Sequence, residues 1–261
     1  MDLQLNGKRA IVTGASRGIG LAIARGLAAE GAVVVMVARN EAALAAAAAT
    51  VPGTTVTVTA DTTDDTSVRS MVEQAVGELG GVDILVNAAA QPAGGPVPPL
   101  TEVTDEAVHA DFDTKVLGYL RCARAVAPHM TAQGWGRIVN ISGLNARRTG
   151  SVSGSIRNVA VAALTANLAD ELGPHGVGVV VVHPGMVETE RTPALIADRA
   201  ARSGRTEEQV RADLAAASSL HRIVTAEEVA DVVVFLASPR AVAVTGDSIG
   251  AGGGNRGAIH Y

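Results

Sequence analysis

Short apolar runs of strand-forming residues alternate with helical stretches along the whole 261-residue chain, and this alternation limits the possible folds more than any single motif does. Apolar runs that are separated by helices predict parallel strands, with helices covering both faces of the sheet. The runs that predict strands are 10–12, 32–37, 54–59, 84–86, 137–141, 177–183 and 247–250. We therefore expect residues 1–261 to form a single α/β domain with one doubly wound parallel sheet, whose ligand binds at the carboxyl ends of the strands.

A glycine-rich turn, TGASRGIG at residues 13–20, follows the first predicted strand and leads directly into a helical stretch. Glycines allow the backbone to turn sharply and to approach a ligand closely. The helix that follows directs its free N–H groups and the positive end of its dipole at an anion. This arrangement predicts a binding site for a dinucleotide, with the pyrophosphate against the turn.

The composition argues against several other classes of function. The net charge of −5, and a content of aromatic residues of only 2%, disfavour binding to nucleic acid or to an anionic membrane. The six histidines show no ligand spacing and Cys122 is the only cysteine, so we expect no metal site and interpret Cys122 as a small core residue. The first residues lack the apolar core of a secretion signal, and no run is long enough to span a bilayer; we expect a cytoplasmic protein with no membrane partner.

Two segments between the predicted strands have patterns of their own. Asn40 is a good helix cap, so the alanine-rich segment 41–50 is predicted to be an ordinary helix. Segment 188–222 is polar, helical in pattern and inserted before the next core helix. It is predicted to form a lid-like helical insertion that contacts substrate, the alternative being helices with ordinary solvated faces.

Five segments of the sequence, 13–20, 61–62, 87–89, 136–142 and 184–189, follow one another in an order that is typical of one family. In these segments the chain resembles the short-chain dehydrogenase/reductase family, and the resemblance extends from about Lys8 to Gly254. It implies a Rossmann-like fold and hydride transfer between a nicotinamide cofactor and a small-molecule substrate. It also suggests a homo-oligomer, a tetramer or dimer, assembled through helices near 113–130 and 157–172 and through the tail after Gly252.

The resemblance implies which positions contact the cofactor. Those around the pyrophosphate and the adenine ribose are Gly14, Ser16, Gly18, Ile19 and Gly20. Those beside the adenine are Asp61 and Thr62. Those at the nicotinamide ribose and carboxamide are Asn87, Ala88, Ala89, Pro184, Gly185, Val187 and Thr189.

The choice between the two nicotinamide cofactors depends on the residues after the second predicted strand. An acid there usually binds the ribose 2′-hydroxyl of NAD(H), but residues 37–40 read VARN. Arg17 and Arg39 are instead placed to bind a 2′-phosphate, which favours NADP(H) over NAD(H). The alternative is that Arg39 is only a surface residue and that both cofactors bind comparably.

The residues that usually perform the family's chemistry are largely replaced. Typical members use an Asn, a Ser, a Tyr and a Lys, but the tyrosine and lysine positions here hold Gly154 and Asn158. The asparagine position holds Lys115. A strict match puts Gly143 at the serine position, and Ser142 reaches the site only if the local backbone differs.

Two functions are consistent with these replacements. The first is an oxidoreductase with a non-standard site, in which Lys115 donates the proton, Asn158 is its neutral hydrogen-bond partner and Ser142 assists. The second is a catalytically silent NADP(H)-binding protein that acts as a sensor, a scaffold or a partner subunit. A separate hypothesis is that Arg147, Arg148 and Arg157 bind an anionic substrate, the alternative being solvated loop arginines.

Overall fold

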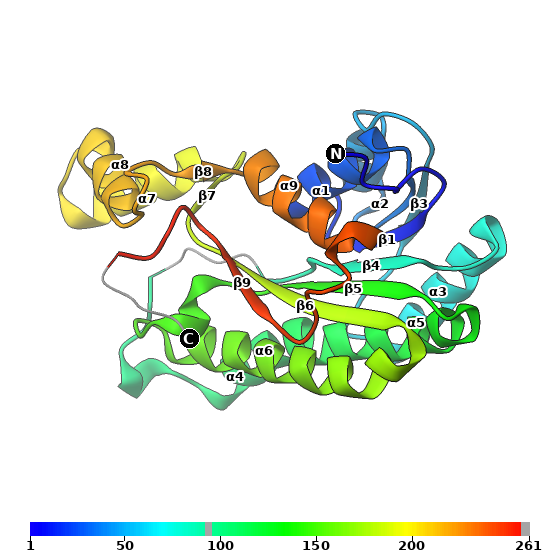
Figure 1. The fold of residues 1–261 in the computed structure, drawn as a ribbon. Helices are drawn as coiled ribbons and strands as arrows, with labels where there is room; N and C mark the ends of the chain where they lie inside the picture. Colours follow the sequence, from blue (N-terminus) through cyan, green and yellow to red (C-terminus); the bar gives the residue numbers. More distant parts are fainter. Residues whose placement is uncertain (92–95, 257–261) are drawn as a thin grey trace.

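The central sheet contains seven strands in the order β3-β2-β1-β4-β5-β6-β9, and every neighbouring pair is parallel (Figure 1). The computed structural model describes residues 1–91 and 96–256. In sheet order, the strands are Thr55–Thr59, Val33–Ala38, Arg9–Thr13, Ile84–Asn87, Gly136–Ile141, Val177–Pro184 and Ser248–Ala251. The predicted doubly wound, Rossmann-like sheet is confirmed, and the predicted strand ends differ from the observed ones by one residue at most.

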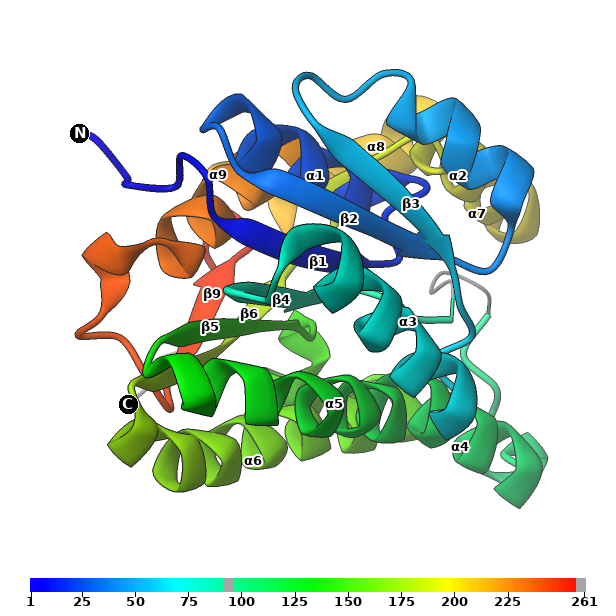
Figure 2. The same ribbon diagram turned by 90° about the vertical axis from the view of Figure 1, so that its right-hand side faces the viewer.

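Helices cover both faces of this sheet (Figures 1 and 2). The helices on one face are α1 (Gly18–Ala29), α2 (Glu41–Ala48) and α9 (Ala226–Ala237). Those on the other face are α3 (Asp65–Leu79), α5 (Gly118–Gln133) and α6 (Val152–Leu172), with α4 (Asp105–Phe112) beside α6. Each face has its own core of valine, leucine, isoleucine and alanine, which explains why the central strands are apolar on both sides.

Local signals account for several helix starts. The Asn40 side chain accepts a hydrogen bond from Ala43 N at 2.8 Å, so α2 begins where its cap predicts. At α9, Thr225 and Glu228 form a reciprocal capping box. Short single-turn helices connect other elements: Leu100–Glu102, Leu144–Arg147, Gly173–His175 and Pro239–Ala241.

The segment before α5 departs from regular helix. Residues Asp113–Leu117 form a π-helical turn, and regular α-helix begins only at Gly118. Single π-helical turns are frequent at functional sites because the extra residue changes the direction in which side chains point. Lys115 lies in the middle of this turn, which the predicted helix over 113–130 did not anticipate.

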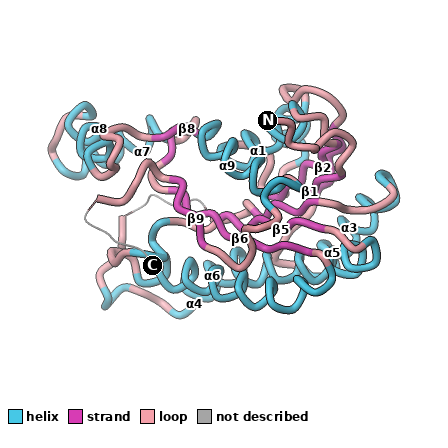
Figure 3. The backbone as a smooth tube through the Cα atoms, in the orientation of Figure 1, coloured by secondary structure: helices cyan, strands magenta, loops and turns pink. Residues whose placement is uncertain are grey.

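The polar segment 188–222 folds into helices and stands apart from the α4–α6 layer (Figure 3). It contains α7 (Thr192–Ser203) and α8 (Glu207–Ala216), flanked by β7 (Val187–Glu188) and β8 (Val224–Thr225), which pair in parallel. A small core holds the two helices together and consists of Ile196, Ala200, Val210 and Leu214. The helical content agrees with the sequence pattern, whereas the role of a lid stays a prediction.

Two further observations concern the described residues 1–91 and 96–256. No helix in them is long and apolar enough to cross a membrane. Cys122 is buried in the core beneath α5, and burial raises the pKa of its thiol to about 12. This environment agrees with the interpretation of Cys122 as a core residue.

Candidate active site

A cleft of about 1240 Å³ lies at the carboxyl ends of the strands, where the sequence predicts the ligand. Its walls come from the glycine turn after β1, the ends of β2 to β6, the π-helical turn, the start of α6 and the inner side of α7 and α8. Segments distant in the sequence therefore meet around one space.

The glycine turn has the close backbone approach that its sequence predicts. Gly14 has φ +68°, and a Cβ there would lie 2.9 Å from backbone atoms of Ala88 and Ala89. A Cβ on Gly20 would lie 2.3 Å from Gly14 O. The N-cap of α1, Arg17, makes no side-chain hydrogen bond to the first turn, so the N–H groups of that turn face the cleft without a side-chain cap. A nucleotide phosphate fits the uncapped N–H groups of this turn, and a side chain at either glycine would collide with the backbone that shapes it.

Most of the predicted cofactor residues line the cleft. They are Gly14, Ser16, Arg17, Gly18, Ile19, Gly20, Arg39, Asp61, Thr62, Ala88, Ala89, Pro184, Gly185 and Thr189. The other two described residues of the prediction, Asn87 and Val187, lie behind its wall. The Asn87 amide donates to Asn140 Oδ1 at 3.0 Å inside the sheet, and Val187 is buried in the core and pairs with Val224.

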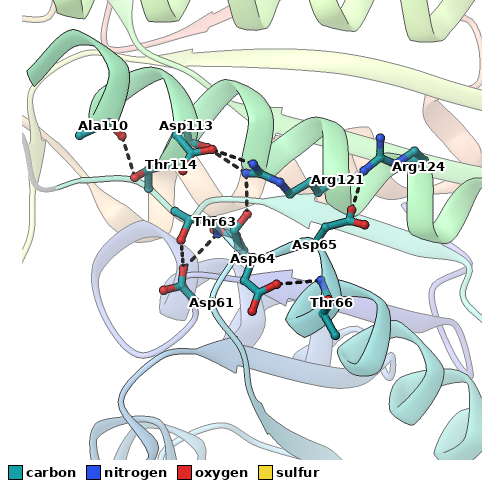
Figure 4. A network of polar contacts seen from close by, with 11 residues as sticks. Asp61, Thr63, Asp64, Asp65, Thr66, Ala110, Asp113, Thr114, Arg121 and Arg124 are labelled. Carbon is teal, nitrogen blue, oxygen red and sulfur yellow. Dashed lines mark hydrogen bonds and ion pairs between the residues drawn. The ribbon is translucent and has the colours of Figure 1, made fainter. Parts of the chain in front are cut away.

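A polar network ties the predicted adenine end to the helix that carries Lys115 (Figure 4). Arg121 donates to the carbonyl of Thr62 and forms an ion pair with Asp113 at 2.8 Å. Asp61 accepts hydrogen bonds from the backbone and the hydroxyl of Thr63, which lower the pKa of its carboxyl group. The loop after β3 is thereby fixed against the π-helical turn.

Lys115, Ser142 and Asn158 converge from three elements at one wall of the cleft. Lys115 Nζ donates to Ser142 O at 2.9 Å and to Asn158 Oδ1 at 3.0 Å. All three residues are buried, and all three line the cleft. The structure thus brings together the three residues predicted to be catalytic; their catalytic role stays a prediction.

The environment of Lys115 disfavours its charged form. Burial, with the guanidinium of Arg157 nearby, lowers the pKa of Lys115 to about 7, while the carboxylate of Asp111 acts in the opposite direction. Asp111 and Arg157 form an ion pair with each other, so the net charge next to Lys115 is small. Desolvation is therefore the main cause of the shift.

The side chain of Ser142 lies in this cluster. The strict sequence match places Gly143 at the serine position, with Ser142 as the alternative. Its hydroxyl lies 3.2 Å from Asn158 O and 3.3 Å from Asn158 Oδ1. The backbone N–H of Ser142 continues the pairing of β5 with β6 through Val182 O. Gly143 also lines the cleft, and a Cβ there would lie 3.1 Å from Asn158 Nδ2. The polar group at this position is therefore the hydroxyl of Ser142.

The space in front of Gly154 is bordered by two side chains that the sequence interpretation missed. A Cβ on Gly154 would lie 2.8 Å from Ser151 Oγ and 3.1 Å from Asn145 Nδ2. Ser151 is the N-cap of α6, a role that its position before the helix could have revealed. Asn145 carries no such signal; Arg148 Nε donates to its Oδ1 at 3.1 Å, which turns its amide nitrogen toward Gly154.

Tyr119, Arg147 and Arg157 make contacts that stabilise the fold. The Tyr119 hydroxyl donates to Ile141 O at 2.8 Å in a buried cluster, and burial raises its pKa. Arg147 donates to Ser248 O at 2.6 Å and Arg157 pairs with Asp111. The structure places Arg157 within α6, so its assignment to a loop was wrong. Of the three arginines considered for an anionic substrate, only Arg148 has neither an ion pair nor a strand carbonyl as partner within the described residues.

Comparisons with known proteins agree with this geometry. The family model for short chain dehydrogenases matches residues 8–200. The chain is 38% identical to the short-chain reductase protein NovJ of Streptomyces niveus over 249 residues, which covers 94% of this chain and 92% of that protein. It is 34% identical to the 3-oxoacyl-[acyl-carrier-protein] reductase FabG of Escherichia coli, over 97% of this chain and 98% of FabG.

A solved structure gives the same result in three dimensions. The L-sorbose reductase of Gluconobacter frateurii, complexed with NADPH and L-sorbose, superposes with a TM-score of 0.92 at 29% identity, covering 99% of this chain and all of that chain. The parallel sheet and the glycine turn define a nucleotide-binding α/β protein. The chain belongs to the short-chain dehydrogenase/reductase family and is an oxidoreductase of that family.

Proposed function

We propose that this protein is an NADP(H)-dependent oxidoreductase that interconverts a carbonyl and a hydroxyl group of a small-molecule substrate, with Lys115 transferring the proton. The observation that carries the proposal is the position of Lys115 Nζ at the cleft wall, held between Ser142 O and Asn158 Oδ1. Its pKa of about 7 suits a group that donates and accepts a proton near neutral pH.

The hydrogen bonds of Lys115 leave it one position for the substrate. A protonated amine has three N–H donors, and two of them are directed at the two acceptors. The third is used by neither bond and would be available to a carbonyl oxygen in reduction. After loss of that proton, the lone pair of the amine would accept a hydroxyl proton in oxidation. Asn158 holds the amine without adding a charge, and the Ser142 hydroxyl borders the same wall.

The cofactor is assigned to the glycine turn and its neighbours. The backbone around Gly14, Gly18 and Gly20 would hold the pyrophosphate, because the first turn of α1 has no side-chain cap and these glycines line the cleft. Arg17 and Arg39 line the cleft and would bind a 2′-phosphate, which supports NADP(H). The NADPH bound to the L-sorbose reductase of similar structure is consistent with this preference. When bound, the nicotinamide supplies or accepts the hydride.

A second candidate is a silent NADP(H)-binding protein. The observation that favours it is the absence of a hydroxyl-bearing side chain at Gly143 and Gly154, the family's serine and tyrosine positions. Under this alternative, the amine of Lys115 is a buried structural group. Proton transfer by Lys115 distinguishes the two candidates, because only the active oxidoreductase requires it.

The chain contains two lysines, Lys8 and Lys115, which provide a matched pair for the test. We expect Lys115→Met to lower the single-turnover rate of NADPH oxidation with reactive aldehydes and ketones by about 10²–10⁴, because a positioned proton donor contributes about that much. NADPH affinity should stay within about threefold, since Lys115 lies outside the predicted cofactor residues. Stopped-flow fluorescence of NADPH measures both quantities.

Lys8→Met is the control, because Lys8 lies over the ring of Trp135, 4.0 Å from its centroid, and is absent from the cleft wall. Its rate should equal that of the wild type. Equal rates for Lys115→Met and wild type would refute the proposed proton transfer. If wild-type protein binds NADPH but oxidises it with none of the aldehydes and ketones, the result would support the silent alternative.

A further inference from the structure

Positive side chains gather around the cleft although the chain as a whole is negative. The net charge is −5, with 26 acidic and 21 basic residues. Arg17 and Arg39 line the side assigned to the cofactor. The basic residues around the remainder are Lys115, Arg148, Arg157, Arg191, Arg199 and Arg222. Among the residues that the structure describes, only three acidic ones line the same cleft: Asp61, Asp111 and Glu190. The cleft is therefore suited to a negatively charged ligand, although the net charge of the whole chain is negative.

Two of these arginines are already neutralised by the fold. Arg157 pairs with Asp111, and Arg222 pairs with Glu228 next to the start of α9. Arg148, Arg191 and Arg199 differ from them, because no carboxylate of residues 1–91 and 96–256 lies within ion-pair distance of any of the three. Arg148 donates to the side chain of Asn145, whereas Arg191 and Arg199 both belong to the α7 wall of the cleft. The guanidinium groups of Arg191 and Arg199 are thus free of ion pairs within the described residues and available to a ligand in the cleft.

The spacing along α7 directs these two arginines to the cleft. Arg191, the N-cap of α7, is followed at intervals of four residues by Leu195 and Arg199 within the helix. This spacing places the three residues on one side of α7, and all three line the cleft. Farther along α7, Arg202 is bonded to Asp198 at 2.5 Å, and neither of these two residues lines the cleft. One helix therefore carries paired charges away from the cleft and unpaired arginines on it.

We propose that the substrate carries an oxyanion, a carboxylate or a phosphate, which Arg191 and Arg199 bind on the α7 wall while its reacting carbon lies near Lys115. The guanidinium group matches both oxyanions through paired N–H donors. Leu195, between the two arginines, offers an apolar contact to the carbon skeleton. This substrate class rests on the proposed function, and it assigns segment 188–222 a binding role.

The test uses pairs of compounds that differ in charge. Levulinate is compared with methyl levulinate, and dihydroxyacetone phosphate with dihydroxyacetone, by calorimetry on protein saturated with NADP⁺. We expect the anion of at least one pair to bind about tenfold more tightly than its neutral analogue, which is the scale of one charge-assisted contact. The pair that shows the difference identifies the carboxylate or the phosphate. Equal binding within both pairs would overturn the proposal.

Variants of α7 attribute the preference to its residues. In the double variant Arg191→Gln, Arg199→Gln, the preference for the anion should disappear, whereas Arg202→Gln should retain it. Circular dichroism verifies that each variant is folded. An anion preference that survives in the double variant would also overturn the proposal.

Titration with NADPH separates failure of this inference from failure of the proposed function. Unchanged NADPH affinity in the double variant is expected. A parallel loss of NADPH affinity would show that the two arginines serve the cofactor, so that the substrate inference fails while the proposed function stands. If wild-type protein does not bind NADPH, the proposed function fails, and the same pairs of compounds are then measured without cofactor.

Discussion

The two ends of the cleft are built from different kinds of groups. At the glycine turn, the ligand-binding surface is mainly backbone, and its shape depends on the absence of side chains at Gly14 and Gly20. At the opposite end, three side chains, Lys115, Ser142 and Asn158, supply the polar groups. This backbone turn tolerates little change because a Cβ at Gly14 or Gly20 collides with neighbouring backbone, whereas a side-chain cluster can exchange residue types and keep a proton-transferring group. The resemblance to the family accordingly covers the glycine turn, whereas the replacement of the family's usual catalytic residues stays a prediction.

After Lys115→Met, we expect the largest loss of function for Gly20→Ala, which alters the backbone of the nucleotide end. The new Cβ would lie 2.3 Å from Gly14 O, so the turn must open. We expect NADPH affinity to fall about 100-fold and the free energy of unfolding to fall by about 1–3 kcal/mol. Fluorescence titration and urea denaturation measure the two effects.

Gly77→Ala is the matched control for that substitution. Gly77 lies within α3, and a Cβ there has nothing within 4 Å. Its replacement should raise the free energy of unfolding by up to about 1 kcal/mol, because alanine is the better helix former, and should leave NADPH binding unchanged. If Gly20→Ala behaved like Gly77→Ala, the backbone account of the nucleotide end would be wrong.

The pH dependence tests the side-chain end. Lys115 has a pKa of about 7 in the folded protein, so its protonated fraction falls above that pH. The single-turnover rate of reduction should therefore fall about tenfold per pH unit above about pH 7, and the rate of oxidation should rise with pH up to about 7 and then level off. In Arg157→Gln, the nearby positive charge is lost and both transitions should move to higher pH. A reduction rate that is flat from pH 6 to 9 would contradict a proton donated by Lys115.

The smallest effect is expected for Arg39→Gln, which alters a side chain at the backbone-dominated end. Loss of one contact to a 2′-phosphate should weaken NADPH binding about tenfold and leave NADH binding unchanged. Titrations with both cofactors measure the difference. Equal losses for NADPH and NADH would instead indicate that Arg39 serves no 2′-phosphate.

The sequence predicts the nucleotide end better than the side-chain end. The glycine turn and the Asn40 cap are local, so the residues that form them are neighbours in the chain. The candidate catalytic residues could be located only from their spacing relative to the family's motif. That spacing does not distinguish Ser142 from Gly143, because the choice depends on the backbone after β5. Asn145 was missed because it faces Gly154 only through the turn that follows β5 and its hydrogen bond with Arg148.

Alternation of apolar runs and the glycine spacing by themselves determined the parallel sheet, its two helical layers and the edge at which a ligand binds. Those features follow from side-chain periodicity and backbone freedom, which act over a few neighbouring residues. Only the tertiary structure decided that Lys115 meets Ser142 and Asn158, 27 and 43 residues away in the chain. It also decided the lowered pKa of Lys115, because burial and hydrogen-bond partners exist only once the π-helical turn, β5 and α6 are packed together.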